Sequence, residues 1–565
     1  MRSGREPLRS RAFLRAVRRI CASYVPEEEQ RALMAFGPRA LGYGSQDDEF
    51  YILLVAERPR VSVRVVQERA LGTRFSLIIA GKKALERDVR RGLLGELLAD
   101  KLLLPYVAIR GRSYLANIEL ELKKRLTREL LMDITYSFPK IATEMLIDPR
   151  FFLYEMATRM GRLMPISAYA FANLLAHPRD RRENEQKMLE GFSRALEELR
   201  REGLVVRDGT FYRPTARLVK KASRPLILNV LWRVRAAVRG LSRYALRILY
   251  GLRAPYMSER KAFMERFGHL AGVNPLSVLP RPEDFLFLRT AIGLRPALKK
   301  ATLDELATSL GLTREPDDID MREIGGTVNL VYLVTVRGAA GLARFVVKYF
   351  KDWRNLTWLS LRLWALGAKK FAISGKERLK REYVMCRELG SMGFPVPRIF
   401  HVDLRASCLV EEFIEGVNFS DILRRFFLGE GGDELVLRLA EEAGRLLASI
   451  HEAGISIGDF KPENLIARPD GGLGLVDLEQ AMRGGDKTWD IAEFLFYSGH
   501  YVPSVSTGEE FEHMATAFLR GYLEAGGPRD AVEKAPSAKF VRVFSIFTPP
   551  QVIEIINELC GGGGP

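Results

Sequence analysis

Cysteine is scarce in this chain of 565 residues, and its four cysteines form no C-x-x-C pair. Neither a disulfide framework nor a zinc site is therefore expected, and this cysteine usage indicates a reducing compartment such as the cytoplasm. The chain also lacks any run of about 18 uncharged apolar residues, which predicts that no segment spans a membrane. The first 20 residues hold seven arginines and no long apolar run, so a secretory signal is not expected there.

Acidic residues are scarce in the first part of the chain. Residues 1–315 hold 58 Lys and Arg against 35 Asp and Glu, a balance of +23, whereas residues 316–565 hold 29 against 35, a balance of −6. The basic excess favours an acidic partner such as RNA, DNA or a ribosome, unless it reflects an Arg-rich proteome in general. With 47% hydrophobic residues, the chain is long enough for several buried cores.

The most informative stretch runs from residue 451 to 480 and reads HEAGISIGDFKPENLIARPDGGLGLVDLEQ. Asp459 follows an apolar helical pattern, Asn464 comes five residues later, and Asp477 ends a short apolar strand. Phosphoryl transfer from ATP needs this order, because one carboxylate orients the attacking hydroxyl while an amide and a second carboxylate hold Mg²⁺ on the phosphates. The spacing also matches the D-x-x-x-x-N of the kinase catalytic loop.

Two signals upstream are typical of a phosphate-binding site. Gly325 and Gly326 open a loop through which backbone N–H groups could approach phosphate, and Val331 returns the chain to a strand. Lys348 then interrupts an apolar strand, and a lysine in such a strand needs charged partners. We expect these partners to be the ATP phosphates and a carboxylate of the next helix, with Glu382 as first choice and Glu377 as second.

Two further segments complete the pattern. Residues 409–416 read LVEEFIEG, and the backbone around Glu412, Phe413 and Ile414 is expected to hold adenine, although Glu411 is acidic where kinases are usually apolar. Asp490 is expected to accept hydrogen bonds from the backbone of the catalytic loop.

Together these motifs resemble the atypical protein-kinase-like superfamily, which includes RIO kinases, the small kinase of the KEOPS tRNA-modification complex and aminoglycoside phosphotransferases. Residues 457–460 (IGDF) are similar to their H-G-D-F/L, with Ile457 in place of histidine, and residues 476–479 (VDLE) are similar to their I-D-F/L. The resemblance implies ATP and Mg²⁺ as cofactors, Asp459 as base or hydroxyl-orienting residue, and Lys461 as the residue that stabilises the transferring phosphoryl group. It also implies that Asn464 and Asp477 hold the metal.

These features predict a cytoplasmic ATP-dependent kinase that phosphorylates Ser or Thr on a protein or on itself. The alternatives are an ATPase that switches a ribonucleoprotein, a small-molecule phosphotransferase, which the absence of an A-P-E motif favours, and a nucleic-acid-binding regulator with a kinase as sensor. A pseudokinase that keeps the fold without the activity is the remaining possibility for this stretch.

The first 113 residues predict a small α/β domain. Strand patterns at 51–56, 61–67 and 75–80 precede a helical pattern at 83–104. Residues 42–45 (GYGS), followed by the acidic residues 47–49, resemble a nucleotidyltransferase motif. The strand positions that hold metal-binding carboxylates in that family are Phe50 and Ile52 here, so the motif indicates either a catalytically dead relative of that family or a coincidence.

Residues 114–222 predict a helical domain that ends in a winged helix. Helical patterns at 151–163, 167–176 and 185–202 precede a hairpin signal at Asp208-Gly209, and the third helix and the wing could contact nucleic acid or dock a protein.

A basic helical connector is expected at 223–315. Four arginines recur there at every fourth position and would form one ridge on a helix, suited to RNA or DNA, anionic lipid at a membrane surface, or carboxylates of this chain: Arg235, Arg239, Arg243 and Arg247. Nucleic acid is therefore expected to bind the region 150–255. The fold class predicted overall is an α+β multidomain protein, with a bilobal protein-kinase-like domain at 316–565 and an archaeal-looking domain order.

Overall fold

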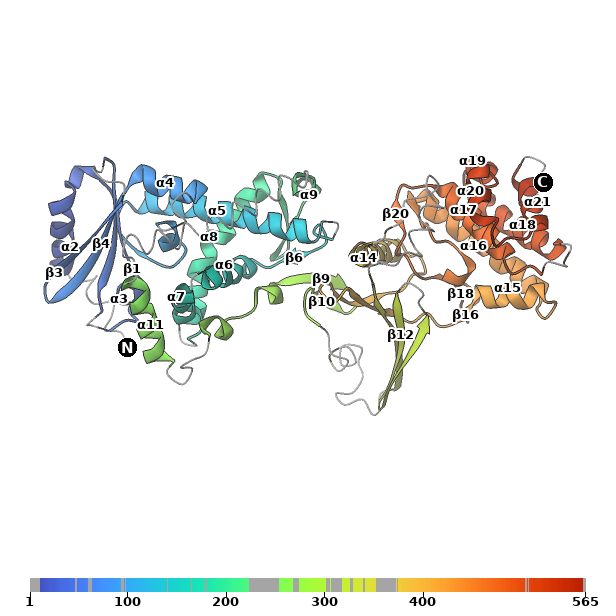
Figure 1. Ribbon diagram of the computed structural model, residues 1–565, viewed down its shortest axis with the longest axis horizontal. Helices are drawn as coiled ribbons and strands as arrows, with labels where there is room; N and C mark the ends of the chain where they lie inside the picture. The colour runs from blue at the N-terminus through green and yellow to red at the C-terminus, as the bar shows by residue number, and fades with distance from the viewer. Residues whose placement is uncertain are drawn as a thin grey trace. The chain divides into compact units, whose positions relative to one another are not determined.

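The computed structural model describes residues 11–45, 48–58, 63–92, 96, 98–139, 141–163, 165–177, 180–222, 254–267, 274–300, 305, 318–325, 329–338, 341–351, 372, 374–503, 506 and 508–561. The chain divides into two compact units, Met1–Phe287 and Leu288–Pro565, which we call unit 1 and unit 2 and describe separately (Figure 1). Several sheets and many helices confirm the α+β class. The finer division into four domains stays a prediction. The arginine ridge and Gly326 lie outside the described residues.

Unit 1 begins with a five-stranded sheet in the order β3-β4-β2-β1-β5. Its strands are β1 (Gln30–Phe36), β2 (Phe50–Ala56), β3 (Val63–Ala70), β4 (Thr73–Gly81) and β5 (Val107–Arg110). Helix α2 (Arg11–Tyr24) buries Phe13, Val17 and Cys21 against the sheet, since residues four apart share one helix face. β2, β3 and β4 coincide with the strand patterns of the sequence, whereas β1 was not among the predicted strands.

One helix expected in unit 1 is interrupted. α4 (Lys82–Arg91) ends at Gly92, which has the left-handed angles φ 62° and ψ 32°, and the next helical element among the described residues is the short 3₁₀ helix η3 (Ala99–Leu102). The buried carboxylate of Asp88 holds this break, because it accepts backbone N–H groups of Glu96, Leu98 and Ala99 at 2.9, 3.0 and 3.1 Å. The prediction of one helix over 83–104 is therefore wrong, since Gly92 ends the helix.

The rest of unit 1 is mainly helical. Its elements are α3 (Gly37–Leu41), α5 (Arg112–Ser137), β6 (Leu146–Ile147), α6 (Arg150–Leu163), α7 (Pro165–Leu175), α8 (Arg181–Arg201), β7 (Val205–Asp208), β8 (Phe211–Pro214), α9 (Ala216–Ala222) and α11 (Ala254–Arg266). The three helices α6, α7 and α8 precede the hairpin β7–β8 in the order expected for a winged helix. Asp208 pairs with Phe211, so the hairpin turn is Gly209-Thr210, one residue later than Asp208-Gly209. Nucleic-acid binding by this region stays a prediction.

Unit 2 opens with a five-stranded antiparallel sheet and one helix. The sheet has the order β11-β12-β13-β15-β14, formed by β11 (Asp318–Gly325), β12 (Leu330–Gly338), β13 (Gly341–Tyr349), β14 (Ile399–Asp403) and β15 (Cys408–Glu412). Helix α14 (Gly375–Ser391) connects β13 to β14 along the chain. Residues that precede the sheet in the chain also contact it, because the N–H of Ala291 donates to the carbonyl of Ile399 in β14 at 2.8 Å.

The second part of unit 2 is helical and holds short strand pairs. Its helices are α15 (Phe419–Phe427), α16 (Asp433–Glu452), α17 (Lys487–Gly499), α18 (Glu509–Glu524), α19 (Arg529–Glu533), α20 (Ala538–Phe544) and α21 (Pro550–Cys560), and its strands are β16 (Val417–Asn418), β17 (Ile455–Ser456), β18 (Leu465–Ala467), β19 (Leu473–Leu475) and β20 (Met482–Arg483). α16 and α18 pack so closely that a Cβ atom on Gly444 or Gly521 would collide with the backbone of the other helix. This pair lies beside α17, and α16 also contacts β17 (Figure 1).

Candidate active site

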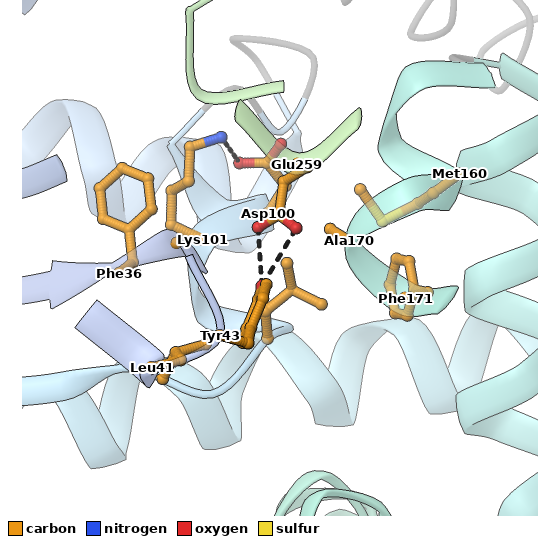
Figure 2. Close-up of a pocket in the computed structure, with 11 residues that line it drawn as sticks. Phe36, Leu41, Tyr43, Asp100, Lys101, Met160, Ala170, Phe171 and Glu259 are labelled. Atoms are coloured by element: carbon orange, nitrogen blue, oxygen red, sulfur yellow. Dashed lines mark hydrogen bonds and ion pairs between the residues drawn. The ribbon is translucent and has the colours of Figure 1, made fainter. Parts of the chain in front are cut away.

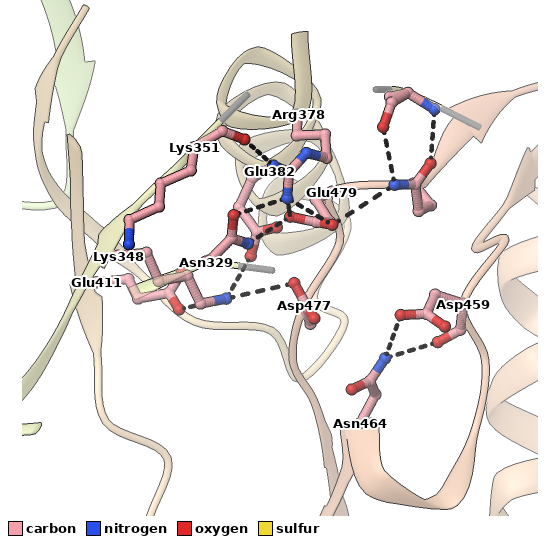
Figure 3. A network of polar contacts seen from close by, with 12 residues as sticks. Asn329, Lys348, Lys351, Arg378, Glu382, Glu411, Asp459, Asn464, Asp477 and Glu479 are labelled. Atoms are coloured by element: carbon pink, nitrogen blue, oxygen red, sulfur yellow. Dashed lines mark hydrogen bonds and ion pairs between the residues drawn. The ribbon is translucent and has the colours of Figure 1, made fainter. Parts of the chain in front are cut away.

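Lys348 is the centre of a buried group of charges in unit 2. It lies on β13, opposite Val331 of β12 in the strand register, and is 6% exposed. Its Nζ is 2.9 Å from Oε1 of Glu382 on α14, 2.9 Å from Oε1 of Glu411 on β15 and 3.7 Å from Oδ1 of Asp477 (Figure 3). The structure thus brings the predicted pair Lys348 and Glu382 together.

Glu411 and Glu377 differ from what the sequence suggested. Glu411 was noted as an acidic residue at an apolar position, but its role as second carboxylate partner of Lys348 was missed. A lone acidic residue in an apolar strand, in a chain with a buried lysine, is the signal that could have found it. Glu377, the second choice for Lys348, pairs instead with Arg381 on its own helix at 3.2 Å.

The charges around Lys348 perturb one another. Burial lowers the pKa of the Lys348 ammonium, but attraction by the three carboxylates outweighs burial and leaves this pKa well above its ordinary value. Burial raises the pKa of the carboxyl groups of Glu382 and Glu411, against the attraction of Lys348. Three carboxyl groups therefore face one ammonium group, and this excess suits a site that holds a proton or receives a further cation.

Asp459, Lys461 and Asn464 form the second cluster of the site, in the loop between β17 and β18. Lys461 Nζ lies 3.0 Å from Oδ1 of Asp459. Asn464 donates through Nδ2 to the Asp459 carbonyl at 2.8 Å and to its Oδ2 at 3.1 Å (Figure 3). Both contacts use the amide nitrogen, so the amide oxygen of Asn464 takes no part in them.

Buried carboxylates on α17 accept hydrogen bonds from the backbone N–H groups of this loop. Asp490, which is fully buried, accepts the N–H groups of Ile457 at 2.8 Å and Gly458 at 2.5 Å, as expected, and its Oδ2 is 3.0 Å from Nε2 of His451. The sequence reasoning missed Glu493, which accepts the N–H of Phe460 at 2.9 Å. Its position three residues after Asp490 on one helix face is the signal that could have found it.

Asp477 follows β19 in a strained backbone conformation. Its φ is 62°, in the left-handed region that costs a residue with a side chain about 1–2 kcal/mol. Oδ1 of Asp477 is buried and has no hydrogen-bond partner among the described residues. The N–H of the preceding Val476 donates to the carbonyl of Asn464 at 2.9 Å, which ties the two predicted metal ligands together. Backbone strain of this kind is concentrated at functional sites.

The predicted nucleotide-binding segments have mixed outcomes. Gly325 ends β11 and pairs with Val331, so the described strands end and resume on either side of the predicted loop, and its binding of phosphate stays a prediction. The carboxylate of Glu412 binds Arg398 at 2.8 and 3.0 Å, and the Phe413 ring lies 5.2 Å from the guanidinium carbon of Arg344. These side chains are engaged with neighbours, and adenine binding by the backbone of Glu412, Phe413 and Ile414 stays a prediction.

A separate small cavity of about 40 Å³ lies in unit 1 (Figure 2). Apolar side chains and the buried pair Asp100–Lys101 line it, and Glu259 of α11 reaches it. Glu259 accepts hydrogen bonds from Tyr43 at 2.8 Å and from Asn173 at 2.9 Å. Burial raises the pKa of the Glu259 carboxyl to about 7. Asp48, from the expected nucleotidyltransferase motif, binds Lys261 at 3.3 Å; the loss of that activity stays a prediction.

Comparisons with known proteins match part of the chain. It is 29% identical over 156 residues to the KEOPS complex subunit Bud32 of Pyrococcus abyssi, and the matched stretch covers 27% of this chain and 66% of that protein. It is 26% identical over 164 residues to the probable serine/threonine-protein kinase BUD32 homolog of Archaeoglobus fulgidus, covering 28% and 72%. It is 30% identical over 151 residues to the EKC/KEOPS complex subunit Tp53rkb of Mus musculus, covering 25% and 57%.

Other comparisons add little. No protein-family model matches the chain. The solved structure of the bifunctional kinase-methyltransferase WbdD aligns with a TM-score of 0.23 and 16% identity, over 36% of this chain and 46% of that one. Among the described helices, none combines the length and the apolar character needed to cross a bilayer. The three relatives confirm the resemblance to the atypical protein-kinase-like superfamily that the motifs predicted, over about a quarter of the chain.

Proposed function

We propose that unit 2 is an ATP- and Mg²⁺-dependent kinase that transfers a phosphoryl group to Ser or Thr, on a protein substrate or on this chain itself. The observation that carries the proposal is the ion-pair centre at Lys348, which carboxylates from α14, β15 and the segment after β19 all reach. A buried lysine with this set of partners suits the α- and β-phosphates of ATP. The relative named as a probable serine/threonine-protein kinase supports the same reaction class.

The residues present fit a hard divalent cation. Asp477 offers a buried carboxylate oxygen that has no hydrogen-bond partner among the described residues, and Asn464 keeps its amide oxygen out of its contacts with Asp459. Oxygen ligands of these two kinds are those that Mg²⁺ prefers. When bound, Mg²⁺ would neutralise charge on the phosphates.

Asp459 and Lys461 would act on the acceptor side. The Asp459 carboxylate orients the hydroxyl group of the acceptor and takes its proton. Burial lowers the pKa of the Lys461 ammonium, but attraction by Asp459 outweighs burial and leaves the pKa raised. Lys461 therefore keeps its positive charge at neutral pH and stabilises the negative charge of the phosphoryl group as it transfers.

The basic N-terminal part of the chain would dock a protein substrate, RNA or DNA. Exposed arginines of α8 and β7, among them Arg194, Arg201 and Arg207, line an open hollow of about 570 Å³. Glutamates line the same hollow, and Arg207 lies 3.8 Å from Glu197, so part of this positive charge is already paired. Two relatives are named as subunits of KEOPS complexes, which supports a place for this chain in a protein assembly.

The test follows labelled phosphate from ATP. The full chain is incubated with γ-labelled ATP and Mg²⁺, with and without total RNA, and label on protein is compared with free phosphate. Label on Ser or Thr supports the proposal. Phosphate release that RNA stimulates, with no labelled protein, would replace it by an ATPase that acts as a switch.

Matched variants assign the chemistry to the site. Asp459→Asn and Asp477→Asn keep the shape of each side chain, and we expect either to abolish transfer while the fold persists. Asp470→Asn is the control, because Asp470 is an exposed carboxylate of the same segment that binds Arg468 at 2.5 Å. Full turnover by Asp459→Asn would show that the catalytic assignment is wrong. If nucleic acid docks on the basic surface, its affinity for the full chain should fall steeply with salt.

A further inference from the structure

A buried arginine joins three elements of the site in unit 2. Arg378 lies on α14, one turn before Glu382, and is 0% exposed. Its Nη1 donates to the two carboxylate oxygens of Glu479 at 3.1 and 3.0 Å and to Oδ1 of Asn329 at 2.6 Å (Figure 3). Its Nη2 donates to the backbone carbonyl of Lys351, which follows β13. An arginine can satisfy several acceptors at once because its guanidinium group is planar and carries five donors.

The two acceptor side chains also bind each other. Asn329 donates through Nδ2 to Oε2 of Glu479 at 2.7 Å. Asn329 immediately precedes β12, at the end of the predicted phosphate loop, and Glu479 comes two residues after Asp477. Their exposed fractions are 7% and 6%. Arg378, Asn329 and Glu479 therefore form a buried group in which each side chain is hydrogen-bonded to the other two, and we call this group the Arg378 clamp.

The clamp connects the same two segments as the ion pairs at Lys348. Arg378 and Glu382 are four residues apart and share one face of α14. One connection runs from Glu382 through Lys348 to Asp477, and the other runs from Arg378 directly to Glu479. Both connections join α14 to the Asp477 segment, so both resist a displacement of α14 away from that segment.

The charge at Lys348 explains why a second connection is needed. Three carboxyl groups surround one ammonium group there, so Glu382 and Asp477 repel each other across Lys348. Phosphates entering this centre would add further negative charge. The clamp, by contrast, pairs one guanidinium with one carboxylate and a neutral amide, and its attraction opposes the separation of α14 from the Asp477 segment.

We propose that Arg378, Glu479 and Asn329 are positioning residues, which hold α14, the start of β12 and the Asp477 segment in the arrangement that phosphoryl transfer needs. This inference rests on the function proposed above and adds to it the means by which the site keeps its geometry. The competing interpretation is a purely structural ion pair, which would affect the stability of unit 2 but not the alignment of the reacting groups.

The experiment separates alignment from stability by three variants. Glu479→Gln keeps the shape of the side chain and removes its charge. The double variant Arg378→Met with Glu479→Leu replaces the buried pair by apolar side chains, an exchange that often leaves stability unchanged or raised. Glu377→Gln is the control, because Glu377 lies on the same helix but pairs with Arg381. For each protein we would measure Tm, kcat and KM for ATP, and Mg²⁺-dependent binding of a fluorescent ATP analogue.

If the clamp positions the site, Glu479→Gln lowers kcat about 100-fold, the scale expected for a displacement of about 1 Å at a reacting centre. KM for ATP rises as well, because Asp477 no longer holds the metal that strengthens ATP binding, and the control behaves like the wild type. The double variant regains the wild-type Tm but not its kcat. A double variant that regains both, or a folded Glu479→Gln protein with full turnover, would overturn the inference.

The binding measurement keeps the two proposals distinguishable. A wild-type protein that binds the ATP analogue in the presence of Mg²⁺ but transfers no phosphate would refute the proposed function alone. The clamp is then judged by binding: Glu479→Gln should lose the increase in affinity that Mg²⁺ causes, and Glu377→Gln should keep it. An equal increase in both variants would overturn the clamp whatever the activity.

Discussion

Glu411→Gln is the perturbation that best tests how the site is charged. Glutamine keeps the size of the side chain and an oxygen that can accept from Lys348, but it removes one of the three negative charges around that lysine. We expect the affinity for ATP to rise about tenfold, which corresponds to about 1.4 kcal/mol. The reason is that Lys348 would share its charge with one close carboxylate instead of two, and the phosphates would meet less repulsion.

The structure also bounds the effect on stability. Glu411 lies 2.9 Å from the Lys348 ammonium, an attraction of about 6 kcal/mol at an effective dielectric constant near 20. Its carboxylate also lies within 4.8 Å of that of Glu382, a repulsion of at least about 3.5 kcal/mol on the same scale. Asp477 adds further repulsion. The charge of Glu411 therefore contributes at most about 2 kcal/mol to the free energy of unfolding.

The assay is an ATP titration of turnover, together with denaturant unfolding of the same samples. Glu415→Gln is the matched control, because Glu415 forms an exposed pair with Arg344, and such surface pairs contribute about 0–1 kcal/mol. Weaker ATP binding by Glu411→Gln, or a loss of stability of more than about 4 kcal/mol, would refute the reasoning, since that loss is typical of an essential buried ion pair.

Three further predictions concern single residues. Asp490→Ala leaves the buried N–H groups of Ile457 and Gly458 without their acceptor, at about 1–3 kcal/mol each, so denaturant unfolding should show a loss of about 2–6 kcal/mol; an unchanged midpoint would contradict this contact. Glu259 has a pKa raised to about 7, so its folded form keeps a proton that the unfolded chain loses above pH 4.5. Stability should therefore fall as pH rises from 4.5 to 7, and Glu259→Gln should flatten this dependence in Tm measured against pH. Gly444→Val would force α16 from α18, and we expect a lower Tm and less soluble protein; wild-type behaviour would show that the two helices can separate without cost.

Several elements were predictable because their signals are local. The strands β2 and β4 are short apolar runs, and the hairpin β7–β8 carries a glycine at its turn, where φ is 61°. β1 was not predictable, because Ala32, Leu33 and Met34 favour a helix by propensity, and pairing with β2 on one side and β5 on the other makes them a strand. The break at Gly92 had a local signal, but the leucines after it suggested a continuing helix.

The placing of Asp459, Lys461 and Asn464 in one loop was predictable from their spacing, because their contacts with one another form within six residues. The partners of Lys348 and Arg378, in contrast, come from distant parts of the chain and depend on its tertiary packing. Glu382 is 34 residues from Lys348, and Glu479 is 101 residues from Arg378. Such pairs depend on how α14 is rotated against the sheet and on where the Asp477 segment passes, and packing across unit 2 sets both.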